Sequence, residues 1–247
     1  MKIVFVGPSL FGAEVDRSGI VFRGPARQGD IARAALQGAT AIGLIDGVFA
    51  SAAAVWHKEI LYALSLGTRV LGAASMGALR AAECAPFGME PIGDIAQRYS
   101  SGELDDDADV ALTFGPEELG YRPLSEPMVD VVDKVERLRQ RDQVTRAEGA
   151  AILAAGQQLY YADRSVQALF RRAFGDTDRA TTIAKSYVAA TPSAKQRDAI
   201  ALLAAMRGEA GPPLVRWQLA EPPFWKRTLQ SIEKEVANSV TIESRII

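Results

Sequence analysis

The sequence predicts an α/β fold: a parallel sheet with helices on both faces, in a Rossmann-like three-layer arrangement, followed by an all-helical C-terminal subdomain. Three short apolar runs in the first third of the chain alternate with stretches of helical spacing. This alternation favours parallel strands joined by crossover helices. From residue 128 onward the helical signal is almost unbroken. We therefore expect an α/β core domain at residues 1–125 and a helical subdomain at residues 126–247.

The first strand is the run KIVFV at residues 2–6, which ends at the turn sequence Gly7-Pro8-Ser9. Buried parallel strands typically have such continuous β-branched and aromatic runs. Residues 7–25 contain several glycines and prolines and show little periodicity, so we expect a long surface loop there. Helical spacing resumes at residues 30–36 and stops near Gly38.

The second strand lies at residues 41–45 and ends at Asp46-Gly47, a common turn dipeptide. Ser51 is in a position to cap the helix that follows. The third strand, at residues 69–74, ends at Ser75, where the next helix begins. Ligands of open parallel sheets bind beyond the carboxyl ends of the strands. The polar turns after the three strands are therefore expected to meet at one edge of the sheet.

The region before the subdomain is predicted to hold a short helix at residues 94–99 and an edge strand at residues 110–114. The helices after it are predicted mainly from apolar spacing and from residues suited to helix caps. The expected caps are Thr145, Asp163, Asp176 and Ser193. The expected helices lie at residues 127–141, 145–162, 164–174, 176–190, 193–208 and 224–238.

Composition and charge narrow the class of protein. The net charge of −2 gives no long-range attraction to nucleic acid or to an anionic membrane, so we expect neither as a partner. No apolar run is long enough to cross a bilayer, and the N-terminal run is too short for a signal peptide. The single cysteine, Cys84, cannot form an intrachain disulfide. We therefore predict a cytoplasmic protein.

No cofactor and no metal are predicted. Neither a GxxxxGK[ST] phosphate loop nor a complete GxGxxG dinucleotide motif is present. One cysteine and one histidine cannot build a zinc cluster within one chain. The acidic run at residues 103–109 could hold Mg²⁺ through carboxylate oxygens. Such a run is more often a solvated loop or a helix start, and this is the interpretation we prefer.

The segment around Ser75 is the strongest candidate for chemistry. Its sequence, Ala73-Ala74-Ser75-Met76-Gly77, resembles a nucleophile elbow in which alanine replaces the first glycine. In such an elbow the N–H of Met76 is placed to bind an oxyanion. Small residues such as Gly77 allow a second backbone or a ligand to approach closely. The competing interpretation is a helix-capping or anion-binding serine, which is the commoner use.

His57 and Asp46 are predicted to complete a catalytic site with Ser75. His57 shares a helix face with apolar residues that are expected to face the sheet near its carboxyl edge. It is therefore the predicted general base, and Asp46 at the neighbouring strand end is predicted to orient its ring. Lys58, the next residue, is a reserve base. A histidine that only bonds the backbone at the edge of the core is an equal alternative.

The predicted substrate-binding residues include Arg80 and Ser9. A guanidinium clamps carboxylate or phosphate groups, and Arg80 lies on the helix that Ser75 starts. The alternative for Arg80 is an i,i+3 ion pair with Glu83. Ser9 belongs to the polar turn after the first strand. The other residues predicted to bind substrate are Met76, Gly77 and Lys58.

Several segments of the chain form one recognisable set: Gly7-Pro8-Ser9-Leu10, Ile45-Asp46-Gly47-Val48-Phe49, Trp56-His57-Lys58-Glu59-Ile60-Leu61, Gly72-Ala73-Ala74-Ser75-Met76-Gly77-Ala78-Leu79-Arg80-Ala81-Ala82-Glu83, Phe87-Gly88-Met89, Gly115-Pro116-Glu117-Glu118 and Tyr121-Arg122-Pro123-Leu124-Ser125-Glu126-Pro127. Together these segments resemble the TfuA-like family. The resemblance covers about the first half of the chain, and the Ser75 segment is its most specific part. Where many members have Asp-Asp-Glu and a later histidine, this chain has Asp106-Asp107-Ala108 and Phe114.

The resemblance implies a role in making thioamides. Proteins of this family accompany YcaO enzymes, which use ATP to activate a peptide-bond oxygen so that sulfur can replace it. The resemblance therefore implies that this chain helps to supply the sulfur. Its expected partners are a YcaO-type enzyme and a ubiquitin-like sulfur-carrier protein that ends in a thiocarboxylate.

The implied task matches the site expected from the residues. Release of sulfide from a thiocarboxylate is acyl transfer, which needs a nucleophile, a base and oxyanion donors. Ser75 would attack the thioacyl carbon, His57 would move its proton with Asp46 orienting the ring, and Arg80 would steer the anionic group. One alternative is a non-catalytic adaptor that binds the carrier and docks it on the YcaO enzyme. Another is an ordinary small-molecule hydrolase. The oligomeric state is left open.

Overall fold

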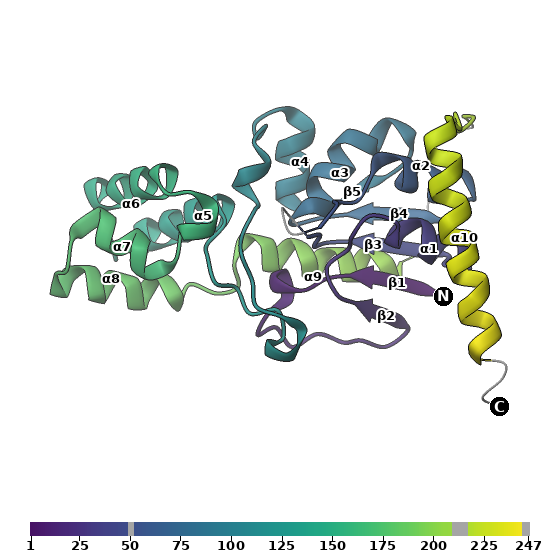
Figure 1. The fold of residues 1–247 in the computed structure, drawn as a ribbon. Coiled ribbons are helices and arrows are strands. Elements are labelled where there is room, and N and C mark those ends of the chain that lie inside the picture. The colour runs from purple at the N-terminus through teal and green to yellow at the C-terminus, as the bar shows by residue number, and fades with distance from the viewer. Residues whose placement is uncertain (49–51, 209–216, 244–247) are drawn as a thin grey trace.

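The computed structural model describes residues 1–48, 52–208 and 217–243. Its centre is a five-stranded sheet with the order β2-β1-β3-β4-β5, in which every neighbouring pair is parallel (Figure 1). This is the strand order of flavodoxin-like doubly wound folds, whose ligands bind where β1 and β3 diverge. The strands are β1 (Lys2–Phe5), β2 (Ile20–Arg23), β3 (Ala41–Leu44), β4 (Arg69–Gly72) and β5 (Glu90–Pro91).

Helices cover both faces of the sheet, as the sequence predicts. One face packs against α1 (Asp30–Leu36), α2 (His57–Ser65) and α3 (Met76–Cys84). The opposite face, which includes Val4 and Leu71, packs against α9 (Ala194–Arg207). A short helix, α4 (Gly93–Ser101), contacts both α3 and α9 beside the last strand. The result is the predicted three-layer arrangement.

A separate lobe of helices lies beyond one end of the sheet (Figure 1). Its own core joins residues from four helices, with Phe170 and Tyr187 at its centre. Thr145 caps the second of them through the N–H of Glu148, as predicted. The four helices are α5 (Met128–Gln140), α6 (Arg146–Gln158), α7 (Val166–Phe174) and α8 (Asp178–Val188).

Two of the predicted helix caps lie one or two residues before the residues that cap the helices. Ser165 caps α7 and Thr177 caps α8, where Asp163 and Asp176 were expected. Asp163 ends a 3₁₀ turn, and Asp176 forms an ion pair with Arg171 instead. Ser193 caps α9 through the N–H of Gln196, as predicted.

The segment expected as one helical subdomain, residues 126–247, is divided in the structure. α9 leaves the lobe and packs on the sheet because Gly43 leaves room there for the side chains of Leu202 and Met206. The last helix, α10 (Pro223–Glu243), packs against α1 and α2 at the far end of the molecule (Figure 1). The helical lobe therefore consists of α5 to α8 alone.

Three local predictions differ from the structure. The segment expected as a loop contains β2, which pairs with β1 along its whole length. The expected edge strand at residues 110–114 makes only one bridge, from Phe114 to Pro123, while the fifth strand is β5. The helix expected to be capped by Ser51 begins at His57 with Trp56 as its N-cap. Ser51 itself lies outside the described residues.

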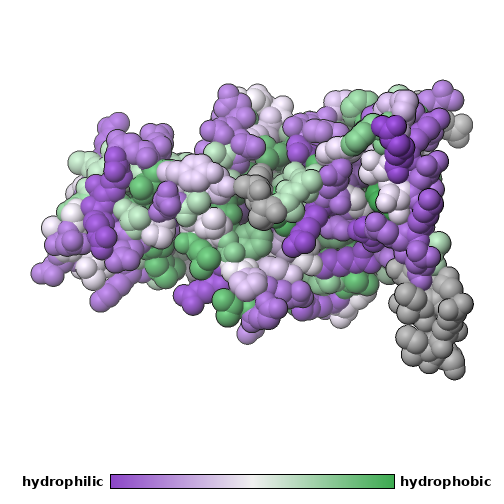
Figure 2. All heavy atoms as spheres, viewed as in Figure 1, coloured by the Kyte–Doolittle hydropathy of each residue, from purple (hydrophilic) through white to green (hydrophobic). Residues whose placement is uncertain are grey.

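The surface of the molecule is mostly hydrophilic in the view of Figure 2, notably over α10 and the outer end of the helical lobe. Hydrophobic residues gather in that view below the helical lobe and toward its junction with the sheet. Within the described ranges, no helix combines the length and the apolar character needed to span a membrane.

Candidate active site

The polar turns after β1, β3 and β4 meet at the carboxyl edge of the sheet, as predicted. Asp46, which follows β3, accepts hydrogen bonds from the turn after β1: from the N–H groups of Gly7 at 2.9 Å and Ser9 at 3.0 Å, and from the Ser9 hydroxyl at 2.7 Å. Asp46 and Ser9 are both buried. Asp46 therefore holds the first turn in place at the point where this strand order places ligands.

A tight turn presents Ser75 at the end of β4. The N–H of Ser75 donates to the carbonyl of Ala73 at 2.7 Å, and Ala74 between them has a φ of 65°. This is a γ-turn, a strained conformation for a residue other than glycine. Such strain costs about 1–3 kcal/mol and is found mainly at functional sites. The turn redirects the chain within one residue, so that α3 starts at Met76.

Glycines let the first turn of α3 lie directly on the sheet. A Cβ on Gly77 would stand 1.8 Å from the carbonyl oxygen of Leu44 in β3, and the N–H of Gly77 donates to Ile45 at 3.1 Å. A Cβ on Gly47 would meet the side chain of Met76. Gly77 and Gly47 therefore allow the close approach that was predicted for small residues here, and this approach sets the position of Ser75.

The hydroxyl of Ser75 is paired with a lysine that sequence reasoning missed. Lys195, in the first turn of α9, places its Nζ 2.9 Å from the Oγ of Ser75 and 2.8 Å from the carbonyl oxygen of Val110. Ser75 is 3% exposed and Lys195 is 1% exposed. A buried serine in contact with a buried lysine is the arrangement of serine–lysine catalytic pairs.

Burial and nearby carboxylates act in opposite directions on Lys195. Burial lowers the pKa of its ammonium group, because an apolar surrounding disfavours the charged form. The carboxylates of Asp46 and Asp130 oppose this by raising that pKa. The net result is a pKa below the usual value for lysine. The neutral amine, which can accept a proton from Ser75, is therefore reached at lower pH than for a lysine in water.

The predicted hydrogen bonds from His57 to Ser75 and Asp46 are absent among the described residues. His57 is instead the first residue of α2, and half of its side chain is exposed. Its Nε2 lies 2.7 Å from the carboxylate of Glu83. The ring is exposed because α2 begins at His57, so that no earlier turn of the helix covers it. Lys195 occupies the place beside Ser75 that was expected for the histidine.

The other predicted binding residues have separate partners. Arg80 donates to the carbonyl of Val55 at 3.0 Å and to Glu83 at 2.7 Å, which is the i,i+3 pair of the alternative interpretation. It lines a hollow of about 640 Å³ together with the acidic run 105–107. Lys58 donates to the carbonyl of Ala220 at the surface.

Of the two predicted backbone groups, only Met76 is free to bind a ligand. The N–H of Gly77 is taken by Ile45. The N–H of Met76 has no acceptor among the described residues, and it directly follows Ser75 in the chain. It remains the candidate oxyanion donor.

A cavity of about 140 Å³ reaches Lys195 from the side of the helical lobe. This volume is well above the roughly 10–15 Å³ that one water needs. Lys134 on one wall donates to Glu126 at 2.9 Å, and the hydroxyl of Tyr187 donates to the same carboxylate oxygen. Polar residues that line the cavity include Ser9, Ser125, Glu126, Asp130, Lys134 and Lys195.

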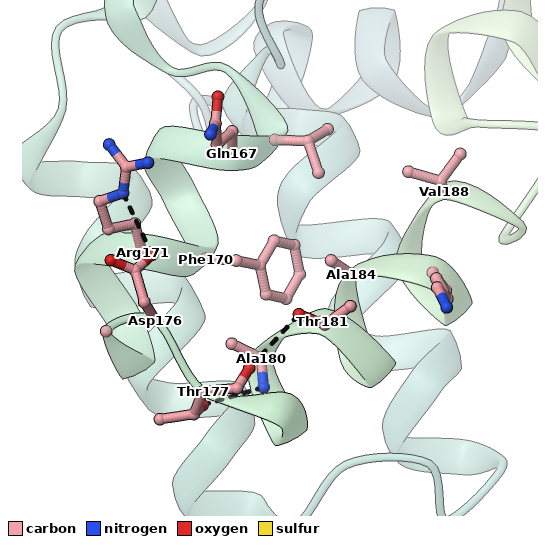
Figure 3. Close-up of a pocket in the computed structure, with 12 residues that line it drawn as sticks. Gln167, Phe170, Arg171, Asp176, Thr177, Ala180, Thr181, Ala184 and Val188 are labelled. Atoms are coloured by element: carbon pink, nitrogen blue, oxygen red, sulfur yellow. Dashed lines mark hydrogen bonds and ion pairs between the residues drawn. The ribbon is translucent and has the colours of Figure 1, made fainter.

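A second hollow, of about 660 Å³, lies between α7 and α8 in the helical lobe (Figure 3). Its walls are mostly apolar, with the ring of Phe170 facing into it. Its hydroxyl groups serve local structure, since Thr177 caps α8 and Thr181 donates to the carbonyl of Thr177. It contains no nucleophile paired with a base, so the chemistry is better assigned to Ser75. Within the described ranges, no group of three or more histidine, cysteine or acidic side chains is placed to hold a metal ion.

Comparison with known proteins supports the family resemblance. Residues 46–165 match the family model described as TfuA-like protein. The matched segment contains Asp46, Ser75 and Asp130, whereas Lys195 lies beyond it. No curated protein matches the chain. The match over residues 46–165 supports assignment to the TfuA-like family, which acts with YcaO enzymes in thioamide biosynthesis.

Proposed function

We propose that this chain delivers sulfur to a YcaO enzyme by releasing sulfide from a thiocarboxylated carrier protein at Ser75. The observation that carries the proposal is the 2.9 Å contact between the Oγ of Ser75 and the Nζ of Lys195, both buried at the ligand-binding edge of the sheet. Lys195 takes the role of general base that the sequence suggested for His57. Neither a metal nor a cofactor is needed for this reaction.

The first step forms an ester on Ser75. The neutral Nζ of Lys195 takes the hydroxyl proton while Oγ bonds to the carbonyl carbon of the thiocarboxylate. The C–S bond then breaks, and the sulfur leaves as hydrosulfide with the proton returned by Lys195. The N–H of Met76 stabilises the oxyanion between these two events. Lys195 also donates to the carbonyl oxygen of Val110, and this second contact fixes the orientation of Nζ and of its lone pair.

The second step regenerates the serine. Water attacks the ester carbon, its proton passes through Lys195 to the Oγ of Ser75, and the carrier leaves with an ordinary carboxylate. Asp46 does not touch the nucleophile; it holds the turn of Ser9 and places a negative charge near Lys195. We therefore assign Asp46 a positioning role in the proposed reaction.

The test is a sulfide-release assay with purified protein and a thiocarboxylated carrier. Ser75→Ala and Lys195→Met are expected to reduce release by at least about 10²-fold, since a positioned base alone contributes about 10²–10⁴. His57→Ala is the matched control and is expected to retain the wild-type rate, because its ring contacts Glu83 at the surface. Release by Ser75→Ala at the wild-type rate would refute the proposal.

A non-catalytic adaptor is the second candidate, and the burial of Ser75 favours it. A group that is 3% exposed meets a carrier terminus only after the surrounding residues move. In this alternative the site holds the terminal anion of the carrier, and the YcaO enzyme removes the sulfur. Sulfide would then appear only when the YcaO enzyme is present, and Ser75→Ala would still bind the carrier. An ester on Ser75, trapped from the carrier and detected by mass spectrometry, excludes the adaptor.

A further inference from the structure

We propose that Asp130 is a positioning residue of the Ser75–Lys195 pair: from the helical lobe, its carboxylate holds the first turn of α9 and provides a negative charge that Lys195 faces. This proposal rests on the proposed function for its catalytic meaning. Its structural content, the coupling of Asp130 to Lys195, can be tested without any catalysis.

The contact joins two lobes of the molecule. Asp130 lies in the first turn of α5, and its Oδ1 accepts the backbone N–H of Lys195 at 2.9 Å. This N–H is one of the donors that a helix N-terminus leaves without a partner. Ser193 caps a different donor of the same turn, the N–H of Gln196. Asp130 thus fixes the residue whose side chain reaches Ser75.

The carboxylate also acts on Lys195 through its charge. Asp130 is almost completely buried, so its charge is weakly screened by water. Two carboxylates act on the charge of Lys195: Asp46, which follows β3, and Asp130 on α5. The wall of the cavity that Lys195 lines also contains Asp130, Lys134 on α5 and Glu126 just before α5. Asp46 and Asp130 both favour the protonated lysine.

A simpler view is that Asp130 only caps α9. That role explains the 2.9 Å hydrogen bond but predicts no effect on the protonation of Lys195. The two views separate when the charge is removed and the acceptor oxygen is kept. Asp130→Asn makes this change. Asp133→Asn is the matched control, because Asp133 also ties α5 to α9, through Arg197, but its carboxylate pairs with arginines and is not among the charges that act on Lys195.

The experiment follows Lys195 by NMR in the full-length protein labelled at lysine Nζ, with Lys195→Met used to assign the signal. Asp130→Asn is expected to lower the pKa of Lys195 by about one pH unit, the low end of the effect of a nearby opposite charge. Asp133→Asn is expected to leave it unchanged. An unchanged pKa in Asp130→Asn, or an equal fall in both variants, overturns the proposal.

Two further measurements complete the test. The acid limb of the pH profile for sulfide release is expected to move to lower pH in Asp130→Asn by the same amount. A pKa that moves while Ser75-dependent release is absent from the wild type refutes the proposed function and leaves the coupling intact. If Asp130→Asn does not fold, the pKa of Asp130 is measured instead, by following its carboxyl carbon signal by NMR as pH is varied, in the wild type and in Lys195→Met. The pKa of Asp130 is then expected to be higher without the lysine, and an equal value refutes the coupling.

Discussion

Replacing Gly77 with alanine tests how the elbow is seated on the sheet. The added Cβ would lie 1.8 Å from the carbonyl oxygen of Leu44, whereas real Cβ contacts essentially never fall below 3.0 Å. The first turn of α3 must therefore move by at least about 1.2 Å away from β3. The position of the Cβ is fixed by the backbone of α3, and the oxygen belongs to the backbone of β3, so no side-chain rotation relieves the overlap. We expect a loss of about 3 kcal/mol in the free energy of unfolding, at the upper end of the usual cost of overpacking.

The same displacement carries Ser75 away from Lys195. A misplacement of about 1 Å can cost 10²-fold in rate, so Gly77→Ala is expected to lose sulfide release even where it is folded. The assays are urea unfolding and sulfide release below the unfolding midpoint. Gly149→Ala is the control, because a Cβ there meets only side chains, those of Arg139 at 3.0 Å and Val135 at 3.2 Å, and the helix gains propensity. Unchanged stability and rate in Gly77→Ala would show that α3 does not rest on β3 as described.

Two further predictions concern stability. Burial raises the pKa of Glu59 to about 7 against the N–H groups of Trp56, Gly29 and Ile31, which lower it. The folded state therefore holds the proton more tightly than the unfolded state. This contributes about 3 kcal/mol to the free energy of unfolding, which is present in full below pH 4.5 and is lost as pH rises through 7. Glu59→Gln is expected to flatten this pH dependence in urea unfolding at pH 5 to 9, and an unaltered dependence contradicts the assignment. Trp225→Ala is expected to cost about 3 kcal/mol by calorimetry, because the ring is buried where α10 meets α2; a loss below 1 kcal/mol contradicts the docking of α10.

The elbow could be predicted from the sequence because its causes are local. A strand, a serine and a run of small residues within a few positions decide the turn, and Gly77 marks the close approach of two backbones. β2 had causes that are not local. Ile20–Arg23 has the β-branched and aromatic composition of a strand, but it is only four residues long and lies between Gly19 and Gly24. The glycines and prolines of residues 7–25 therefore favoured a loop, and pairing with β1 decides the outcome.

Lys195 could not be found by reading along the chain, because the whole helical lobe separates it from Ser75. One signal was nevertheless present. Lys195, Ala199, Leu202 and Met206 share one face of α9, and the last three pack on the sheet. A lysine on an otherwise apolar helix face is expected to be buried with a partner. Which partner it meets depends on how α9 crosses the sheet, and this crossing cannot be read from the sequence of the helix itself.

The burial of Lys195 itself bears on the choice between catalysis and binding. An ammonium group taken from water costs several kcal/mol, and an apolar residue of similar size is often as stable or more stable at such a position. Here the surrounding carboxylates already have other donors: Asp46 accepts from the turn of Ser9, and Asp130 accepts a backbone N–H. Stability alone therefore gives little reason for a lysine at this place. Its contact with the hydroxyl of Ser75 gives a chemical reason for a lysine. Burial lowers the pKa of Lys195 and so favours the neutral amine, which is the form that can take a proton from serine.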